Sequence, residues 1–250
     1  MSVRTETSER TSAQGSLQSQ QQNWNLPSSR TELAVPAELR TLQPFAPAAM
    51  TCKRALDVVL SAAALLILMP AITLLWIAVR LTSRGPALYS HKRVGKGGVP
   101  FRAWKFRSMR EDADSLLRHH LESDPLLRSE WERDHKLKND PRVTAIGKFL
   151  RKTSLDELPQ LWNVFSGDMT LVGPRPIVTA EIPRYGDALS YYLSVRPGIT
   201  GLWQISGRNN TTYAERVCFD ERYVKNWSLT LDLYILLRTV KTVLFGEGAY

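Results

Sequence analysis

Cysteine is scarce in this chain, with two among 250 residues. Cys52 and Cys218 lie far apart and fit neither a disulfide framework nor a metal site, so a reducing compartment is expected. Acylation of Cys52 beside an apolar run is an alternative, but an ordinary thiol is the expected state. The four histidines show no HExxH-type spacing, so the sequence predicts no histidine-bound metal.

Residues 1–49 have too few periodic apolar residues to form a core. They are rich in Ser, Thr, Gln, Ala and Pro, which predicts a disordered polar tail. No basic start leads directly into an apolar stretch, so a secretory signal is not expected. The first fifty residues hold four arginines and four glutamates, so the net charge of +9 lies in residues 51–250. That excess predicts an anionic partner such as nucleic acid, a membrane face or a phosphorylated substrate.

Charge is also absent from the run Val58 to Val79, which is long enough to cross a bilayer core of about 30 Å. Pro70 should bend a helix there, with Ser61 or Thr73 as candidate partners for the freed carbonyls. Basic residues, which mark the cytoplasmic side, flank both ends: Lys53, Arg54, Arg80, Arg84, Lys92 and Arg93. We therefore expect a re-entrant membrane helix hairpin over 50–86, with a straight transmembrane span as the alternative.

Residues 87–250 show the pattern of a helix-rich domain with a small β-hairpin or sheet, so the expected class is α/β and membrane-associated. The expected elements are a hairpin around GKGG (95–98), helices within 108–138, an amphipathic helix at 145–154, a strand in DMTLVG and a helix at 228–245. The last helix places six apolar side chains on one face: Leu229, Leu233, Leu236, Leu237, Val240 and Leu244. Core packing and an interfacial position on a membrane are both open to that face.

Two adjacent carboxylates, Asp156 and Glu157, begin an otherwise apolar run, SLDELPQL. Pro159 is best tolerated in a first helical turn, which places the expected helix start near Asp156. One interpretation is structural, because Ser154 and Glu157 fit a capping box and Asp156 could be an N-cap. The other is chemical: adjacent helical side chains point about 100° apart, so one carboxylate would attack while the other holds a cation.

Basic residues suited to phosphate accompany these carboxylates, since a guanidinium fork matches phosphate oxygens. Each arginine alone is compatible with an ordinary surface charge, but three of them lie in Pro- or Gly-rich loops, where binding residues concentrate. The candidates are Lys105, Arg151, Arg175 between two prolines, Arg196 and Arg208.

Five stretches, in this order, resemble the bacterial sugar transferase family, the monotopic phosphoglycosyl transferases. They are KRALDVVLSAAALLILMPAI, FRAWKFRSM, RKTSLDELPQLWNVFSGDMTLVGPRP, VRPGITGLWQISGRN and YVKNWSLTLDL. The resemblance covers about residues 50–245 and is to the compact, catalytic-core type that starts exopolysaccharide synthesis. Family members often have Ser-Pro at the membrane bend, where this chain has Met69-Pro70.

The resemblance implies transfer of a hexose-1-phosphate from a UDP-sugar, galactose or glucose, to undecaprenyl phosphate, with release of UMP. It implies that Asp156 is the nucleophile, forming a covalent phosphosugar intermediate, and that Glu157 binds Mg²⁺. It further implies phosphate-binding or site roles for Lys105, Arg151, Arg175, Arg196, Arg208 and Asp220. The implied location is the bacterial inner membrane, in contact with membrane lipid, with the catalytic domain on the cytoplasmic face.

Two other classes fit less well. An inactive membrane scaffold of polysaccharide assembly would not need the intact Asp156–Glu157 pair. A nucleic-acid binder would suit the charge and the seven tryptophans but not the uncharged run, so no nucleic-acid partner is expected. The sequence leaves homo-oligomerisation open.

Overall fold

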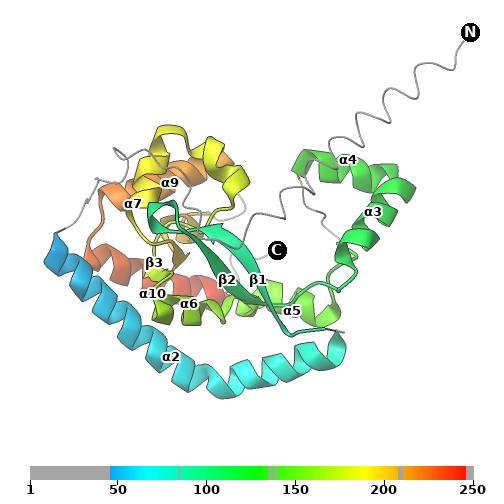
Figure 1. Ribbon diagram of the computed structural model, residues 1–250, viewed down its shortest axis with the longest axis horizontal. Coiled ribbons are helices and arrows are strands. Elements are labelled where there is room, and N and C mark those ends of the chain that lie inside the picture. Colours follow the sequence, from blue (N-terminus) through cyan, green and yellow to red (C-terminus); the bar gives the residue numbers. More distant parts are fainter. Residues whose placement is uncertain (1–45, 84, 135–136, 138–139, 208–210, 246–250) are drawn as a thin grey trace, which may run out of the picture. The chain divides into compact units, whose positions relative to one another are not determined.

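The computed structural model describes residues 46–83, 85–134, 137, 140–207 and 211–245, and its elements alternate helices with two small sheets (Figure 1). The expected tail lies outside these residues except for residues 46–49. In chain order the elements are α2 (Pro47–Thr82), β1 (Leu88–Val94), η2 (Lys96–Gly98), β2 (Pro100–Phe106), α3 (Ala113–Ser123), α4 (Pro125–Asp134), α5 (Ala145–Thr153), η3 (Leu155–Glu157), α6 (Gln160–Ser166), β3 (Thr170–Val172), η4 (Thr179–Ala188), α7 (Leu189–Ser194), β4 (Gly198–Thr200), α8 (Leu202–Ile205), α9 (Tyr213–Lys225) and α10 (Leu229–Phe245).

The apolar run forms one helix of 36 residues, α2, with Pro70 inside it. Figure 1 shows that α2 bends along its length, but it stays a single helix and does not separate into two. By length and composition it could cross a membrane, with a mean hydropathy of 2.6 in its most apolar window. Pro70 frees the carbonyl of Leu66, one turn earlier. The expected role of Ser61 there is wrong, because its hydroxyl donates to the Val58 carbonyl at 3.2 Å.

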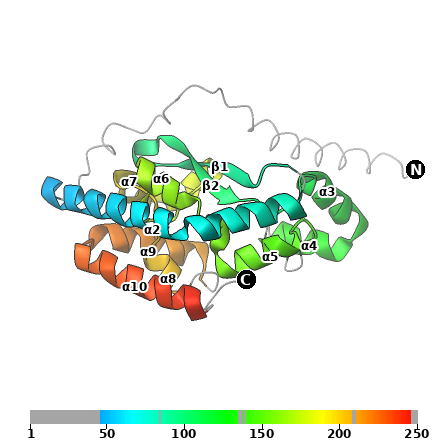
Figure 2. The same ribbon diagram turned by 90° about the horizontal axis from the view of Figure 1, so that it is seen from below.

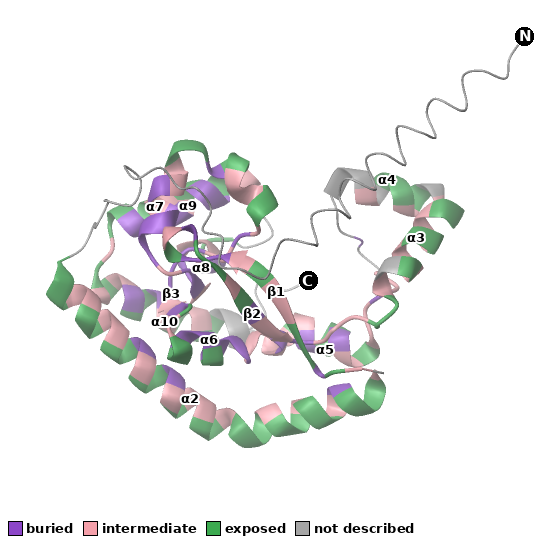
Figure 3. Ribbon diagram, in the orientation of Figure 1, coloured by how far each residue is buried: buried purple, intermediate pink, exposed green. Residues whose placement is uncertain are grey.

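The polarity of α2 is inverted relative to a helix on the surface of a soluble domain. Its three buried residues are Asp57, Ser61 and Val79. Its large apolar side chains are exposed instead, which Figure 3 shows as a mostly green and pink helix: Leu56, Val59, Leu60, Leu66, Ile67, Met69, Leu74, Trp76, Ile77 and Leu81. A continuous apolar surface of this kind suits lipid and is not expected to face water.

Both ends of α2 pack on the rest of the domain. Near the start, Asp57 accepts hydrogen bonds from the Thr170 hydroxyl at 2.7 Å and the Leu171 N–H at 2.9 Å. Near the end, Val79 packs with Phe106 and Leu150 in one of the hydrophobic clusters. The remainder of the domain therefore holds the helix at two points, on either side of its bend.

The expected hairpin is confirmed. β1 and β2 pair antiparallel, with Val94 opposite Pro100, and Gly97 in the turn has a φ of 67°. A positive φ favours glycine, so GKGG provides the turn that the register requires. The strand expected in DMTLVG is confirmed as β3, but its parallel pairing with β4 was not expected from the sequence.

The helices expected within 108–138 and at 145–154 and 228–245 are confirmed as α3, α4, α5 and α10. The structure also resolves which face of α10 is packed. Ile235 is fully buried in the cluster with Val224, whereas Leu233, Leu237 and Val240 are exposed. The expected leucine-rich face thus lies mostly outside the core. Figure 2 shows α10, α6 and α5 on the side of the domain where α2 runs.

Candidate functional site

The two carboxylates lie at a sharp reversal between α5 and α6. Ser154, the residue that turns the chain, has a φ of 56° and is the non-glycine residue with positive φ in the described part of the chain. Such a conformation is uncommon for serine and marks a constrained position. The Ser154 side chain makes no capping hydrogen bond, so the capping-box interpretation of SLDE is wrong. Asp156 and Glu157 instead occupy the short turn η3, and α6 starts later, at Gln160.

One lysine from the β-hairpin joins both carboxylates. Lys105 Nζ lies 2.5 Å from Glu157 Oε1 and 3.6 Å from Asp156 Oδ2. Lys105 is in β2, so this contact brings a strand that is distant in sequence onto η3. The expected grouping of Lys105 with Asp156 and Glu157 is therefore present in the structure.

The pKa values of the two neighbouring carboxyl groups are shifted in opposite directions. Burial raises the pKa of Asp156, and the Glu157 charge adds to this, while Lys105 and Arg151 oppose it. Burial also acts on Glu157, but the charges of Lys105, Arg175 and Arg93 outweigh it and lower its pKa. Glu157 is thus the more firmly anionic group, as a cation ligand requires. Asp156 is a partly desolvated carboxylate, and desolvation favours nucleophilic attack.

Arg151 and Arg175 approach the carboxylates from two sides. Arg151 Nε donates to the Ser108 hydroxyl at 2.9 Å, and its charge acts on Asp156. Arg175 acts on Glu157, and its guanidinium carbon lies 5.4 Å from the centre of the Trp203 ring. The structure therefore brings both arginines to the site.

The backbone of the Pro-Arg-Pro loop is fixed on both sides of Arg175. The Gly198 N–H donates to the Pro174 carbonyl at 2.8 Å, next to the parallel β3–β4 pair. A side chain on Gly198 would clash with the backbone of Gly173, since its Cβ would lie 2.2 Å from that nitrogen. After the loop, the Tyr192 hydroxyl accepts from the Ile177 N–H at 3.2 Å. The arginine is therefore presented by a rigid support.

Arg93 is a site residue that the sequence analysis did not identify. It lies in β1, and its Nη1 donates to the carbonyl of Pro176 at 3.2 Å and lies 3.9 Å from Glu181 Oε2. Its charge acts on both Glu157 and Arg175. The alternation of β1 gave a weak signal, because Arg93 neighbours the buried Val94, but only the tertiary contact assigns it to the site.

Asp220 forms a buried layer behind Arg175. Its carboxylate accepts from the Tyr185 hydroxyl at 2.8 Å. Burial raises the pKa of Asp220 to about 6, opposed by Tyr185, Arg216 and Arg175. Arg216 in turn lies 3.3 Å from Glu181, the partner of Arg93. Asp220 is therefore linked to the site through Arg175, and to Glu181 through Arg216.

Arg196 and Arg208 do not join this group in the described structure. Arg196 Nε donates to the Gly167 carbonyl at 2.7 Å, at the far end of α6 from the carboxylates. Arg208 lies outside the described residues.

The donor set fits a hard divalent cation only with help from a substrate. The described residues contain no group of three or more His, Cys, Asp and Glu side chains able to hold a metal by themselves. Asp156 and Glu157 offer two adjacent carboxylates, and Mg²⁺ prefers one or two carboxylates completed by phosphate oxygens and water. Two carboxylates within the influence of four cations have the chemistry that suits a phosphorylated substrate, since a carboxylate can attack phosphorus and cations can neutralise phosphate charge.

Comparison with known proteins agrees with this geometry. Residues 48–246 match the model of the family described as "Bacterial sugar transferase". The chain is 55% identical over 198 residues to the undecaprenyl-phosphate galactose phosphotransferase of Salmonella typhimurium. It is 40% identical over 206 residues to the UDP-glucose:undecaprenyl-phosphate glucose-1-phosphate transferase of Escherichia coli. It is 44% identical over 223 residues to the exopolysaccharide production protein ExoY of Sinorhizobium fredii.

The relatives differ in length. The matched region is 79% of this chain but 41% of both the Salmonella and the E. coli proteins. For ExoY it is 89% of this chain and 97% of the relative. The chain therefore corresponds to less than half of the first two relatives and to nearly all of the third.

Proposed function

Because this chain belongs to the bacterial sugar transferase family, we propose that it transfers a hexose-1-phosphate from a UDP-sugar to undecaprenyl phosphate. UMP is the second product, and the reaction would start exopolysaccharide synthesis. The names of the relatives support the donor and acceptor, and they include both galactose and glucose transferases. The donor sugar in this proposal is therefore galactose or glucose.

The observation that carries the proposal is the placement of Asp156 beside Glu157, with Lys105 contacting both. In the first half-reaction an Asp156 carboxylate oxygen attacks the β-phosphorus of the UDP-sugar. The new oxygen–phosphorus bond replaces the bond to the bridging oxygen, and UMP leaves with that oxygen. In the second half-reaction a phosphate oxygen of undecaprenyl phosphate attacks the same phosphorus and releases Asp156. Two displacements of this kind predict ping-pong kinetics.

The cations stabilise the charge that develops on the leaving UMP. The charges of Arg175 and Arg93 act on Glu157, and the charge of Arg151 acts on Asp156, so positive charge would lie close to the reacting phosphates. Preorganised donors of this type are usually the largest catalytic contribution. We further propose that Glu157 holds Mg²⁺ together with diphosphate oxygens. The ion would supply additional neutralisation of the leaving group.

The acceptor is a lipid, and the structure supports a membrane position for α2. Its apolar side chains are exposed, and both of its ends pack on one catalytic domain. A helix that crossed the bilayer would place its ends about 30 Å apart on opposite sides. We therefore propose that α2 enters and leaves the inner membrane on the cytoplasmic face, bent at Pro70. Basic residues at both ends support this orientation.

A trapping experiment tests the chemistry. The purified protein, incubated with UDP-galactose or UDP-glucose and Mg²⁺ but without acceptor, should release about one equivalent of UMP. Mass spectrometry should then find a hexose-phosphate adduct on Asp156. Asp156→Asn should give no adduct and lower turnover by at least roughly 10³-fold. Turnover by a sequential mechanism, with no adduct in the wild type, would exclude the covalent route.

Cysteine labelling tests the topology. Cys52 precedes the apolar run, and a single cysteine introduced as Ser83→Cys, in a Cys52→Ser, Cys218→Ser background, follows it. An impermeant thiol reagent applied to inverted inner-membrane vesicles should reach position 52 in Cys218→Ser, where Cys52 is the remaining cysteine, and position 83 in the triple variant. Reaction at the two positions from opposite sides would show that α2 crosses the membrane.

A further inference from the structure

A groove separate from the catalytic carboxylates opens beside the first turns of α2. It has a volume of about 670 Å³, and its other walls are the glycine-rich turn of the β-hairpin and the segment that follows α7. The residues that give it chemical character are Met50, Arg54, Val58, Val59, Lys96 and Arg196. The carboxylates and cations around Asp156 do not line it.

Three cations from three separate elements converge on this groove. The described residues that line it include Arg54, Lys96 and Arg196 but no carboxylate. Their charges act on one another: burial and then Arg196 lower the pKa of Lys96, and burial and then Arg54 lower the pKa of Arg196. Like charges held together around an open cavity are most stable with an anion among them.

Two of these cations, Arg54 and Arg196, are held in position by hydrogen bonds to backbone carbonyls. Arg54 donates to the carbonyls of Val164 and Phe165, at 2.6 and 2.9 Å, and Arg196 donates to that of Gly167. These carbonyls lie in the last turn and C-cap of α6, where the Val164 carbonyl also accepts from the Gly167 N–H at 3.1 Å, so the cations suit the negative end of the helix dipole. Lys96 is not held in this way, because its ammonium has no hydrogen-bond or ion-pair partner within the described part of the chain.

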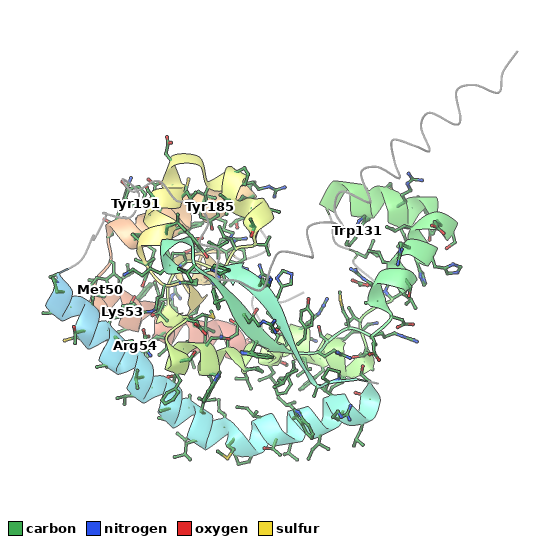
Figure 4. All side chains as sticks on the ribbon, viewed as in Figure 1. Met50, Lys53, Arg54, Trp131, Tyr185 and Tyr191 are labelled. Atoms are coloured by element: carbon green, nitrogen blue, oxygen red, sulfur yellow. The ribbon has the colours of Figure 1, made fainter. Side chains whose placement is uncertain are left out.

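The remaining wall of the groove is apolar. Met50, Val58 and Val59 come from α2, and Val59 is 63% exposed at the start of the apolar surface of that helix. Figure 4 shows Met50 and Arg54 on the side of α2 that faces the domain. A ligand that fits both walls has an anionic head and an apolar body, and the apolar body continues along α2.

We propose that this groove binds an anionic glycerophospholipid of the leaflet into which α2 inserts. The lipid phosphate lies among Arg54, Lys96 and Arg196, and the acyl chains follow the exposed side of α2. Three positive charges favour a headgroup with net negative charge over a zwitterionic one. This inference rests on the membrane position of α2 proposed above, but not on the transfer reaction.

Lipid binding by the full chain tests the groove. Native mass spectrometry in detergent, with added phosphatidylglycerol or phosphatidylcholine, counts retained lipids, and flotation with vesicles of the same lipids measures affinity. Lys96→Gln should weaken phosphatidylglycerol binding about fivefold, as expected for loss of one cation at a lipid headgroup. Lys92→Gln, a matched change at an exposed lysine of the same hairpin that does not line the groove, should change it less than about twofold.

Equal losses in the two variants would show general surface electrostatics and overturn the proposal. So would full displacement of the lipid by millimolar inorganic phosphate, because the site would then bind phosphate alone. UMP release by the wild type in the same vesicles reports separately on the proposed function. If lipid binding depends on Lys96 but the protein shows no turnover, the lipid site stands and the proposed reaction is refuted. If the protein shows turnover but lipid binding does not depend on Lys96, the reaction stands and the lipid site is refuted.

Discussion

Lys53, at the start of α2, forms a buried ion pair with Asp232 of α10, with Nζ and Oδ2 2.5 Å apart. The two side chains are 12% and 9% exposed. Asp232 also accepts from the Tyr223 hydroxyl and the Trp227 indole N–H, at 2.8 and 3.0 Å. This carboxylate thus joins the apolar helix to two later parts of the chain.

Loss of one partner in this pair should destabilise the domain. Lys53→Met leaves Asp232 buried with its charge uncompensated, and the expected cost is roughly 3 to 5 kcal/mol of unfolding free energy. Denaturant unfolding in detergent measures it. The double variant Lys53→Met/Asp232→Leu should lose less than the sum of the single variants. Lys225→Met, which removes one partner of the exposed Lys225–Glu221 pair, is the control and should have little effect. If the double variant lost as much unfolding free energy as the two single variants together, the result would contradict an interaction between Lys53 and Asp232.

Lys105 should set the pH at which the nucleophile becomes active. Burial and Glu157 raise the pKa of Asp156, and Lys105 opposes them. In Lys105→Met that opposition is gone, so the pKa of Asp156 rises further and the acid limb of the kcat/KM profile should move to higher pH. Activity at pH 7 should also fall by roughly 10². Lys105→Arg should restore part of it, and Lys92→Met is the matched control. If the acid limb of the kcat/KM profile is unchanged in Lys105→Met, Lys105 does not influence the protonation of Asp156.

Arg93 should contribute to phosphate stabilisation although sequence motifs do not identify it. Because its charge reaches Glu157 and Arg175, Arg93→Gln should lower kcat/KM for the UDP-sugar by roughly 10- to 100-fold. Arg102→Gln, an exposed arginine of the neighbouring strand, should leave it within about twofold. Thermal unfolding of both variants checks that the hairpin remains folded. Equal activity of the two variants would remove Arg93 from the site.

Asp220 should make stability depend on pH in the mildly acidic range. Its pKa is about 6 in the folded protein against 3.8 for the free side chain, so the folded state binds its proton more tightly. The contribution of Asp220 to the free energy of unfolding is therefore complete below about pH 4 and is lost as the pH rises through 6. The total loss is on the order of 3 kcal/mol. Asp220→Asn should remove that slope between pH 4 and pH 7 in unfolding measurements. An identical slope in both proteins would contradict the assignment.

The sequence predicted the elements that depend on local pattern. Glycines at 95–98 marked the hairpin turn, and apolar spacing marked α5 and α10. The strand in DMTLVG was predicted, but its pairing with the three-residue β4 could not be foreseen, because their contact depends on the close approach of Gly173 and Gly198. The outward direction of Leu233 and Leu237 likewise depends on what α10 packs against.

The residues of the candidate site also fall into those that local sequence predicted and those that depend on tertiary contacts. Asp156, Glu157, Lys105, Arg151 and Arg175 were named from motifs, and the structure brings them together. Arg93 was missed because its link to the Pro-Arg-Pro loop runs through Pro176 and Tyr192, which are remote in sequence. Ser154 was misread as a helix cap because its left-handed backbone cannot be inferred from residue type.

Helix α6 begins three residues after Glu157 and ends where Arg54 binds the carbonyls of Val164 and Phe165. Its seven residues correspond to a rise of about 10 Å. This short helix therefore packs along α2 and joins the turn that carries Asp156 and Glu157 to the start of that helix. With α2 in its proposed membrane position, lengthening α6 by one turn would therefore displace the carboxylates relative to the lipid without altering either side chain.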